Sequence, residues 1–152
     1  MDQCETQTPI LVDFKITNNE TANKVYFSMK LNVQEEVNGP LEMILEANRC
    51  DLKKKHCGHY QDLKITQICQ KFKDPFSVFS KAFAGIEPKI ACPIKVANYI
   101  MTESSLDLSM ITGLPIDGHV WLVRIKWMSG NKNVLCLDNE TKITKIKTEK
   151  DT

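Results

Sequence analysis

The alternation of apolar and polar residues is strictest between Lys24 and Gln34, where every second side chain is apolar. A spacing of two predicts a β-strand with one dry face and one wet face. Weaker forms of the same pattern predict strands over Ile10–Thr17, Leu41–Ala47 and Val120–Met128. Shorter apolar runs suggest strands over Ile94–Met101, Leu106–Ile111 and Asn133–Leu137, with one more near Ile143 and Ile146.

The pattern changes between Cys57 and Cys92, the only part of the chain with helical spacing. The residues that follow this spacing from Leu63 onward are Ile65, Ile68, Cys69 and Phe72. Asp74 followed by Pro75 then predicts the start of a second helix, because aspartate caps helices and proline suits their first position. That helix would carry Phe76, Phe79 and Phe83 as one stripe and end near Gly85.

Two blocks of strands flanking a partly helical insert predict a mainly β protein. Strands with one apolar face pair naturally in antiparallel sheets, which favours a cup or a two-sheet sandwich with one or two short helices. The chain of 152 residues suits a single domain spanning residues 1–152, with a charged tail from about residue 147.

Six cysteines are an even and high number for this length, and they predict disulfides in a secreted, extracellular or lumenal protein. The sequence begins with polar residues and shows no signal-peptide pattern, so a reduced cytosolic protein is the alternative. Two Asn-x-Thr triplets, at Asn19 and Asn139, are candidate glycosylation sites. The net charge of +1 gives no field that would attract nucleic acid, so no nucleic-acid partner is expected.

Catalytic motifs are missing from the sequence. It contains no Gly-rich phosphate loop, nucleophile elbow or His-Glu-x-x-His helix, so neither an enzyme nor a cofactor is predicted. A zinc site built from Cys50, His56, Cys57, His59 and Cys69 is an alternative, but the spacing lacks paired Cys-x-x-Cys units and no metal is predicted. Lys53, Lys54 and Lys55 either contact anionic headgroups or form a solvated loop, and the loop is favoured.

Four features occur in a familiar order along the chain. Cys4 precedes the strands, a Cys-x6-Cys unit spans Cys50 to Cys57, and Cys69 comes before a Cys-Pro-Ile-Lys segment that begins at Cys92. A Gly-His-Val-Trp to Ser-Gly-Asn-Lys to Cys segment then runs from residue 118 to Cys136. In this order the chain resembles the ganglioside activator proteins and their secreted insect relatives, within the lipid-recognition (ML-type) group. The resemblance covers about residues 4–146.

The resemblance implies a cup of antiparallel strands with an internal apolar cavity. It also implies the disulfides Cys4–Cys136, Cys50–Cys57 and Cys69–Cys92. The chain lacks a further disulfide that the activator carries before the Cys-Pro segment and has the Phe-rich helix there instead. Because of this departure, the resemblance predicts neither the activator's ligand nor a glycosidase partner for this chain.

The function expected from these observations is that of a secreted, monomeric carrier or extractor, which binds one hydrophobic ligand in an apolar cavity. That ligand would be a lipid, glycolipid, fatty acid or hydrocarbon-type semiochemical, and delivery would involve a membrane surface or a receptor. The candidate cavity residues are Val25, Phe27, Met29, Leu31, Trp121, Val123, Ile125 and Trp127 on strands, with Phe76, Phe79 and Phe83 as a lid. The alternative is a secreted, disulfide-stabilised interaction module with a solid core, because the same alternation serves both.

Overall fold

The structure of the protein, a computed structural model, describes residue 4 and residues 7–21, 24–107 and 118–143. The described residues form seven strands and two short helices. The strands are β1 (Ile10–Thr21), β2 (Lys24–Val33), β3 (Leu41–Cys50), β4 (Cys57–Ile65), β5 (Ala97–Asp107), β6 (His119–Ser129) and β7 (Lys132–Ile143). The helices α1 (Ile68–Lys73) and α2 (Val78–Ala82) lie between β4 and β5 in the chain.

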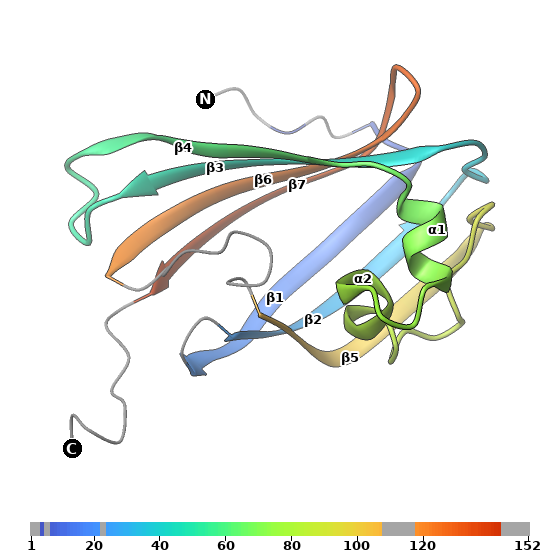
Figure 1. The fold of residues 1–152 in the computed structure, drawn as a ribbon, viewed down its shortest axis with the longest axis horizontal. Coiled ribbons are helices and arrows are strands. Elements are labelled where there is room, and N and C mark those ends of the chain that lie inside the picture. Colours follow the sequence, from blue (N-terminus) through green and yellow to red (C-terminus); the bar gives the residue numbers. More distant parts are fainter. Residues whose placement is uncertain (1–3, 5–6, 22–23, 108–117, 144–152) are drawn as a thin grey trace.

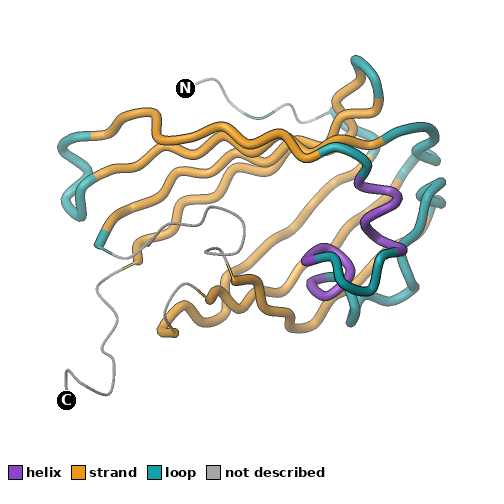
Figure 2. The backbone as a smooth tube through the Cα atoms, in the orientation of Figure 1, coloured by secondary structure: helices purple, strands orange, loops and turns teal. Residues whose placement is uncertain are grey.

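Two antiparallel sheets face each other, which confirms the predicted fold class (Figures 1 and 2). One sheet has the strand order β1-β2-β5 and the other has the order β4-β3-β6-β7. On one side of the sandwich, the edge strands β1 and β7 contact each other. On the other side, α1 contacts β3 and α2 contacts β5, so the helix pair bridges the two sheets.

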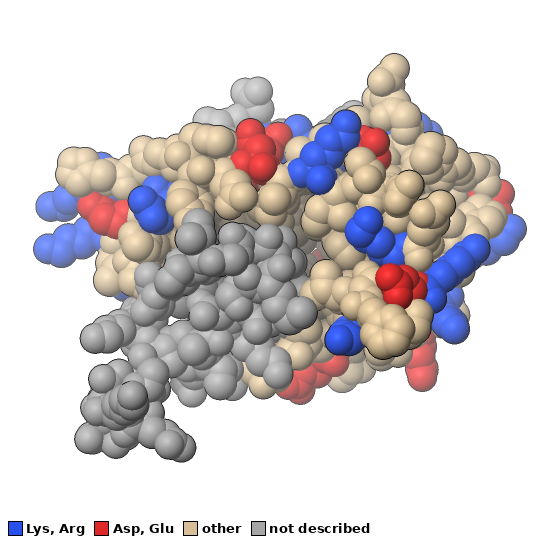
Figure 3. Space-filling model, in the orientation of Figure 1, with Lys and Arg blue, Asp and Glu red and all other residues tan. Residues whose placement is uncertain are grey.

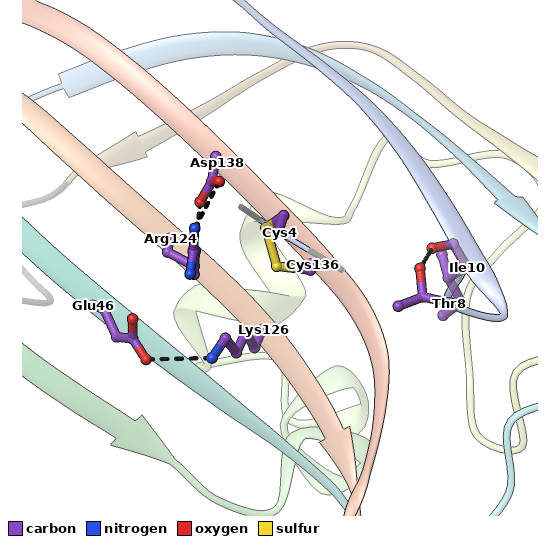
Figure 4. Close-up of a disulfide and its surroundings, with 8 residues drawn as sticks. All are labelled: Cys4, Thr8, Ile10, Glu46, Arg124, Lys126, Cys136 and Asp138. Carbon is purple, nitrogen blue, oxygen red and sulfur yellow. Dashed lines mark hydrogen bonds and ion pairs between the residues drawn. A yellow bond between two sulfur atoms is a disulfide. The ribbon is translucent and has the colours of Figure 1, made fainter. Parts of the chain in front are cut away.

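The register of the four-stranded sheet separates its charged outer face from its apolar inner face. On the outer face, Glu46, Arg124 and Asp138 lie side by side on β3, β6 and β7. The Arg124 side chain donates from Nε to Asp138 at 2.7 Å and from Nη2 at 3.0 Å, and Lys126 pairs with Glu46 at 3.5 Å (Figure 4). A paired guanidinium explains why Arg124 is only 6% exposed.

The same contact sets the acid behaviour of Asp138. Hydrogen bonds from Arg124 hold the pKa of the Asp138 carboxyl below its ordinary value. Because the pKa is lower in the folded state, this pair stabilises the fold above the ordinary pKa of aspartate. That contribution is lost as the pH falls through the lower pKa of the folded protein.

The strands that the alternation predicted are present, but several boundaries differ. The structure corrects the helical assignment of Leu63 and Ile65, which belong to β4, a strand that the sequence analysis missed. One strand, β5, replaces the two predicted near Ile94 and Leu106, and residues 108–111 lie outside the described residues. Ile143 continues β7 instead of forming a separate strand, and Ile146 lies outside the described residues.

The start of the second helix was also predicted wrongly. Asp74 ends α1, and its carboxylate accepts a hydrogen bond from the backbone N–H of Phe76 at 3.0 Å in the turn between the helices. The cap of α2 is Ser77, whose hydroxyl oxygen accepts from the N–H of Phe79 at 3.1 Å. Two capping residues lie three positions apart here, and the later one begins the helix.

Three disulfides are present, Cys4–Cys136, Cys50–Cys57 and Cys69–Cys92, the pairs that the resemblance implies. The first joins the segment before β1 to β7, and therefore links one sheet to the other (Figure 4). The second closes the turn between β3 and β4, and the third ties α1 to the segment before β5. No cysteine is free, which is typical of proteins from an oxidising extracellular or lumenal compartment.

We expect the Cys4–Cys136 and Cys50–Cys57 disulfides to differ in their effect on stability. Replacing Cys4 and Cys136 with serine frees a loop with a sequence separation of 132 residues, and the chain-entropy account gives a loss of about 5 kcal/mol. Replacing Cys50 and Cys57 frees a separation of only 7 residues, for a loss of about 2.4 kcal/mol. Urea unfolding of both double variants measures the difference. Equal losses would show that loop closure does not determine the stabilisation.

Candidate ligand-binding pocket

An apolar pocket of about 210 Å³ lies between the inner faces of the two sheets. From the four-stranded sheet it is lined by Met43, Leu45, Ala47, Leu63, Trp121, Val123, Ile125, Trp127, Leu135 and Leu137. From the three-stranded sheet it is lined by Val12, Phe14, Ile16, Phe27 and Met29, and from the helical segment by Val78, Phe79, Ala82 and Phe83. The space exceeds what one water molecule needs, and such walls offer water few hydrogen bonds.

Aromatic rings define the end of the pocket that lies at the helices. The Trp127 ring lies 6.2 Å from the ring of Phe72 and 6.2 Å from that of Phe83, measured between centroids. The rings of Phe72 and Phe83 meet edge to face at 5.3 Å. This cluster fixes α1 and the end of α2 against β6, since such ring pairs add to the energy of burial.

A hydrogen bond fixes the other side of α2. The Ser104 hydroxyl on β5 donates to the carbonyl oxygen of Ala82 at 2.6 Å. The helix is therefore held to both sheets, with Phe79 directed at the pocket and only 8% exposed.

Polar side chains line the opposite end of the pocket. They are Tyr60 and Gln61 on β4 and Asn139 and Thr141 on β7. The Asn139 amide Nδ2 donates to the Thr141 hydroxyl oxygen at 2.5 Å. Tyr60 occupies an irregularity in the pairing of β3 with β4, where Ala47 pairs with Gln61 and Asn48 with His59. The extra residue places Tyr60 against Trp121, with ring centroids 4.9 Å apart.

This polar end was not predicted from the sequence, because the strand that carries Cys136 was expected to end at Leu137. The signal was present, since Asn139 and Thr141 continue the spacing of Leu135 and Leu137 by twos. An extended strand would have placed both on the inner face. Tyr60 had no such signal, because the irregularity in β4 interrupts the alternation.

Eight of the predicted site residues line the pocket: Phe27, Met29, Phe79, Phe83, Trp121, Val123, Ile125 and Trp127. Two predictions are corrected. Leu31 is 1% exposed and lies in the packed part of the core, next to Val12 on β1 and Tyr99 on β5. Phe76 is 87% exposed in the turn between the helices and belongs to no lid. The side chain of Val25 lies outside the described residues.

A second, polar hollow of about 380 Å³ lies at the end of β3, β4 and β6. Its lining includes Arg49, the Cys50–Cys57 disulfide and all three histidines, His56, His59 and His119, and it shares Tyr60 with the apolar pocket. The cysteines of the zinc alternative are all in disulfides. Within the described residues, no group of histidine, cysteine and acidic side chains is placed to hold a metal ion.

Neither comparison with known proteins produced a match: no model of a known protein family fits the sequence, and no curated protein is similar to it. In the part of the chain that the structure describes, no helix has the length and apolar character needed to cross a bilayer.

We expect Asn139 to carry no glycan in the folded protein. Its Nδ2, the atom to which a glycan attaches, donates to Thr141 on the pocket wall. The measurement is site-resolved mass spectrometry of protein secreted from a glycosylating host. A Pro40→Thr variant creates an Asn-x-Thr triplet at the exposed Asn38 and serves as the positive control. Glycan at Asn139 in folded, disulfide-bonded protein would show that this end of the pocket is arranged differently. The side chain of Asn19, the other candidate, lies outside the described residues.

Proposed function

We propose that the protein is a secreted carrier or extractor that binds a single hydrophobic ligand in the apolar pocket. The observation that carries this proposal is a space between two sheets with walls that are almost entirely apolar. The ligand is a lipid, a fatty acid or a related hydrocarbon compound. The protein acts without catalysis, as a monomer, and passes its ligand to a membrane surface or a receptor.

The energetics of burial support a carrier role. Moving a hydrocarbon chain from water into apolar surroundings yields about 0.8 kcal/mol for each methylene group. A long chain therefore gains enough to offset the loss of freedom on association. The walls stand on paired strands, and the helical wall is fastened by Cys69–Cys92, so little ordering remains to be done when the ligand enters.

Native mass spectrometry tests the proposal directly. Protein purified from a eukaryotic host should carry one hydrophobic molecule, or accept one from lipid vesicles, in a ratio of one to one. Binding of no compound from a panel of lipids, fatty acids and hydrocarbons would contradict the carrier role. The disulfide-stabilised interaction module would then be the better interpretation.

Three phenylalanines of the helical segment provide matched variants. We expect Phe79→Ala to weaken ligand binding at least tenfold, because its ring lines the pocket. Truncating a phenylalanine in a packed core to alanine costs about 3–5 kcal/mol of stability. Phe79→Ala should cost less, because one side of the ring faces the open space of the pocket. Affinity and thermal unfolding are measured on the same samples.

The neighbouring rings serve as controls. Phe72 is 9% exposed and does not line the pocket, so Phe72→Ala should cost mainly stability. Phe76 is 87% exposed, and Phe76→Ala should change neither property. If Phe79→Ala lowers stability as much as Phe72→Ala and leaves the affinity of the folded fraction intact, Phe79 is ordinary core.

A further inference from the structure

The inner face of the four-stranded sheet changes character along the strands. Following the register, the row nearest the helices contains Ile65, Met43, Trp127 and Leu135, and the next contains Leu63, Leu45, Ile125 and Leu137. The third row contains Gln61, Ala47, Val123 and Asn139, and the fourth contains Arg49, Trp121 and Thr141. The wall is therefore apolar for two rows, then mixed, and then carries a cation.

The cation lies where the pocket and the polar hollow meet. The Arg49 guanidinium carbon is 4.8 Å from the centroid of the Tyr60 ring, and Tyr60 lines both spaces. His119 continues the inner face beyond Trp121, with ring centroids 6.1 Å apart. A guanidinium remains charged at every accessible pH and presents several donors in one plane, a geometry suited to carboxylate and phosphate.

The acidic side chains of the β3–β4 turn and of the neighbouring strands β4 and β7 have other partners. Asp62 contacts His59 at 2.9 Å, Glu140 pairs with Lys54, and Asp51 accepts from the backbone N–H of Lys55 at 2.8 Å. Among the described residues, no carboxylate forms an ion pair with Arg49. Its charge is therefore available to an anion that comes from outside the chain.

The β3–β4 turn adds positive charge at the same end of the sheet. Lys53, Lys54 and Lys55 are exposed in this turn, and blue side chains project there at the left of the space-filling view (Figure 3). The sequence alone favoured a solvated loop for these lysines, and all three are exposed in the turn. From this position beside the polar hollow they would also attract an anionic head group before it reaches Arg49.

We propose that the pocket selects a single-chain amphiphile with an anionic head, a carboxylate or a phosphate. The chain lies along the apolar rows toward Trp127, and the head is bound by Arg49 beside His119. This inference rests on the proposed function and narrows its ligand class. A neutral hydrocarbon would form no ion pair with Arg49, so it is not the preferred ligand.

Four compounds with a twelve-carbon chain test the head group: dodecanoate, dodecyl phosphate, dodecanol and dodecyltrimethylammonium. The affinity of each is measured by its displacement of the neutral probe N-phenyl-1-naphthylamine from the purified protein. At least one of the two anions should bind roughly 10-fold to 100-fold more tightly than dodecanol, the range expected for a hydrogen bond to a charged group. The tighter of the two identifies the head as carboxylate or phosphate.

The outcomes separate this inference from the proposed function. If dodecanol or the ammonium compound binds as tightly as both anions, the head-group inference fails while the carrier role stands. If none of the four displaces the probe or binds directly, the proposed function fails with it.

A charge-matched pair of variants locates the head. Arg49→Gln should remove the advantage of the anions and leave dodecanol binding unchanged. Lys30→Gln removes one charge from an exposed position on β2, which belongs to the other sheet, and should change neither affinity. If the preference for anions survives Arg49→Gln, or disappears equally in Lys30→Gln, Arg49 does not bind the head.

The two tryptophans report the direction of the chain. They lie six residues apart on one strand, which corresponds to roughly 20 Å. Dodecanoate with bromine on its terminal carbon should quench Trp127 in the Trp121→Phe variant more than it quenches Trp121 in the Trp127→Phe variant. The reverse order would overturn the proposed orientation.

Discussion

The packing of α1 and α2 between the sheets is the constraint on which the pocket depends. Two sheets with apolar inner faces normally close on each other at roughly 10 Å and fill the space with interdigitating side chains. Here β1 and β7 meet on one side, while the helix pair bridges to β3 and β5 on the other. The ring cluster of Phe72, Phe83 and Trp127 takes the place that sheet-to-sheet contacts would otherwise occupy.

Much of the fold was predictable from alternation alone, because one wet and one dry face leave a period of two in the sequence. β2 and β6 show it most clearly, and both lie inside their sheets. β4 was missed because its extra residue at Tyr60 breaks the period of two. It also ends at Ile65, only a few residues before α1, so its last apolar residues fit the helical spacing of α1. Phe76 and Phe79 were predicted to lie on the same stripe of one helix, but Phe76 is exposed and Phe79 is buried. The reason is that α2 is capped by Ser77, three residues after Asp74, so Phe76 precedes the helix.

The candidate site was predictable only in part. Alternation identifies Trp121, Val123, Ile125 and Trp127 as one face, but a filled core and a hollow one require the same pattern. The difference lies in how closely the opposite walls approach, which depends on the helix pair and the disulfides and has no signature in any single strand. The polar end depends on register across β3, β4, β6 and β7, which brings together residues that are distant in sequence.

The Cys50–Cys57 disulfide makes the alignment of β3 with β4 independent of the turn that connects them. These cysteines are also register partners, so the bond fixes the pairing of β3 with β4 at the point where the turn begins. The length and charge of the six intervening residues are thereby freed from the task of aligning the pocket wall. Substitutions and insertions in this turn would alter what approaches the pocket without shifting its walls. In a carrier of the proposed kind, ligand preference could therefore diversify in this turn, during evolution or by design, while the scaffold stays the same.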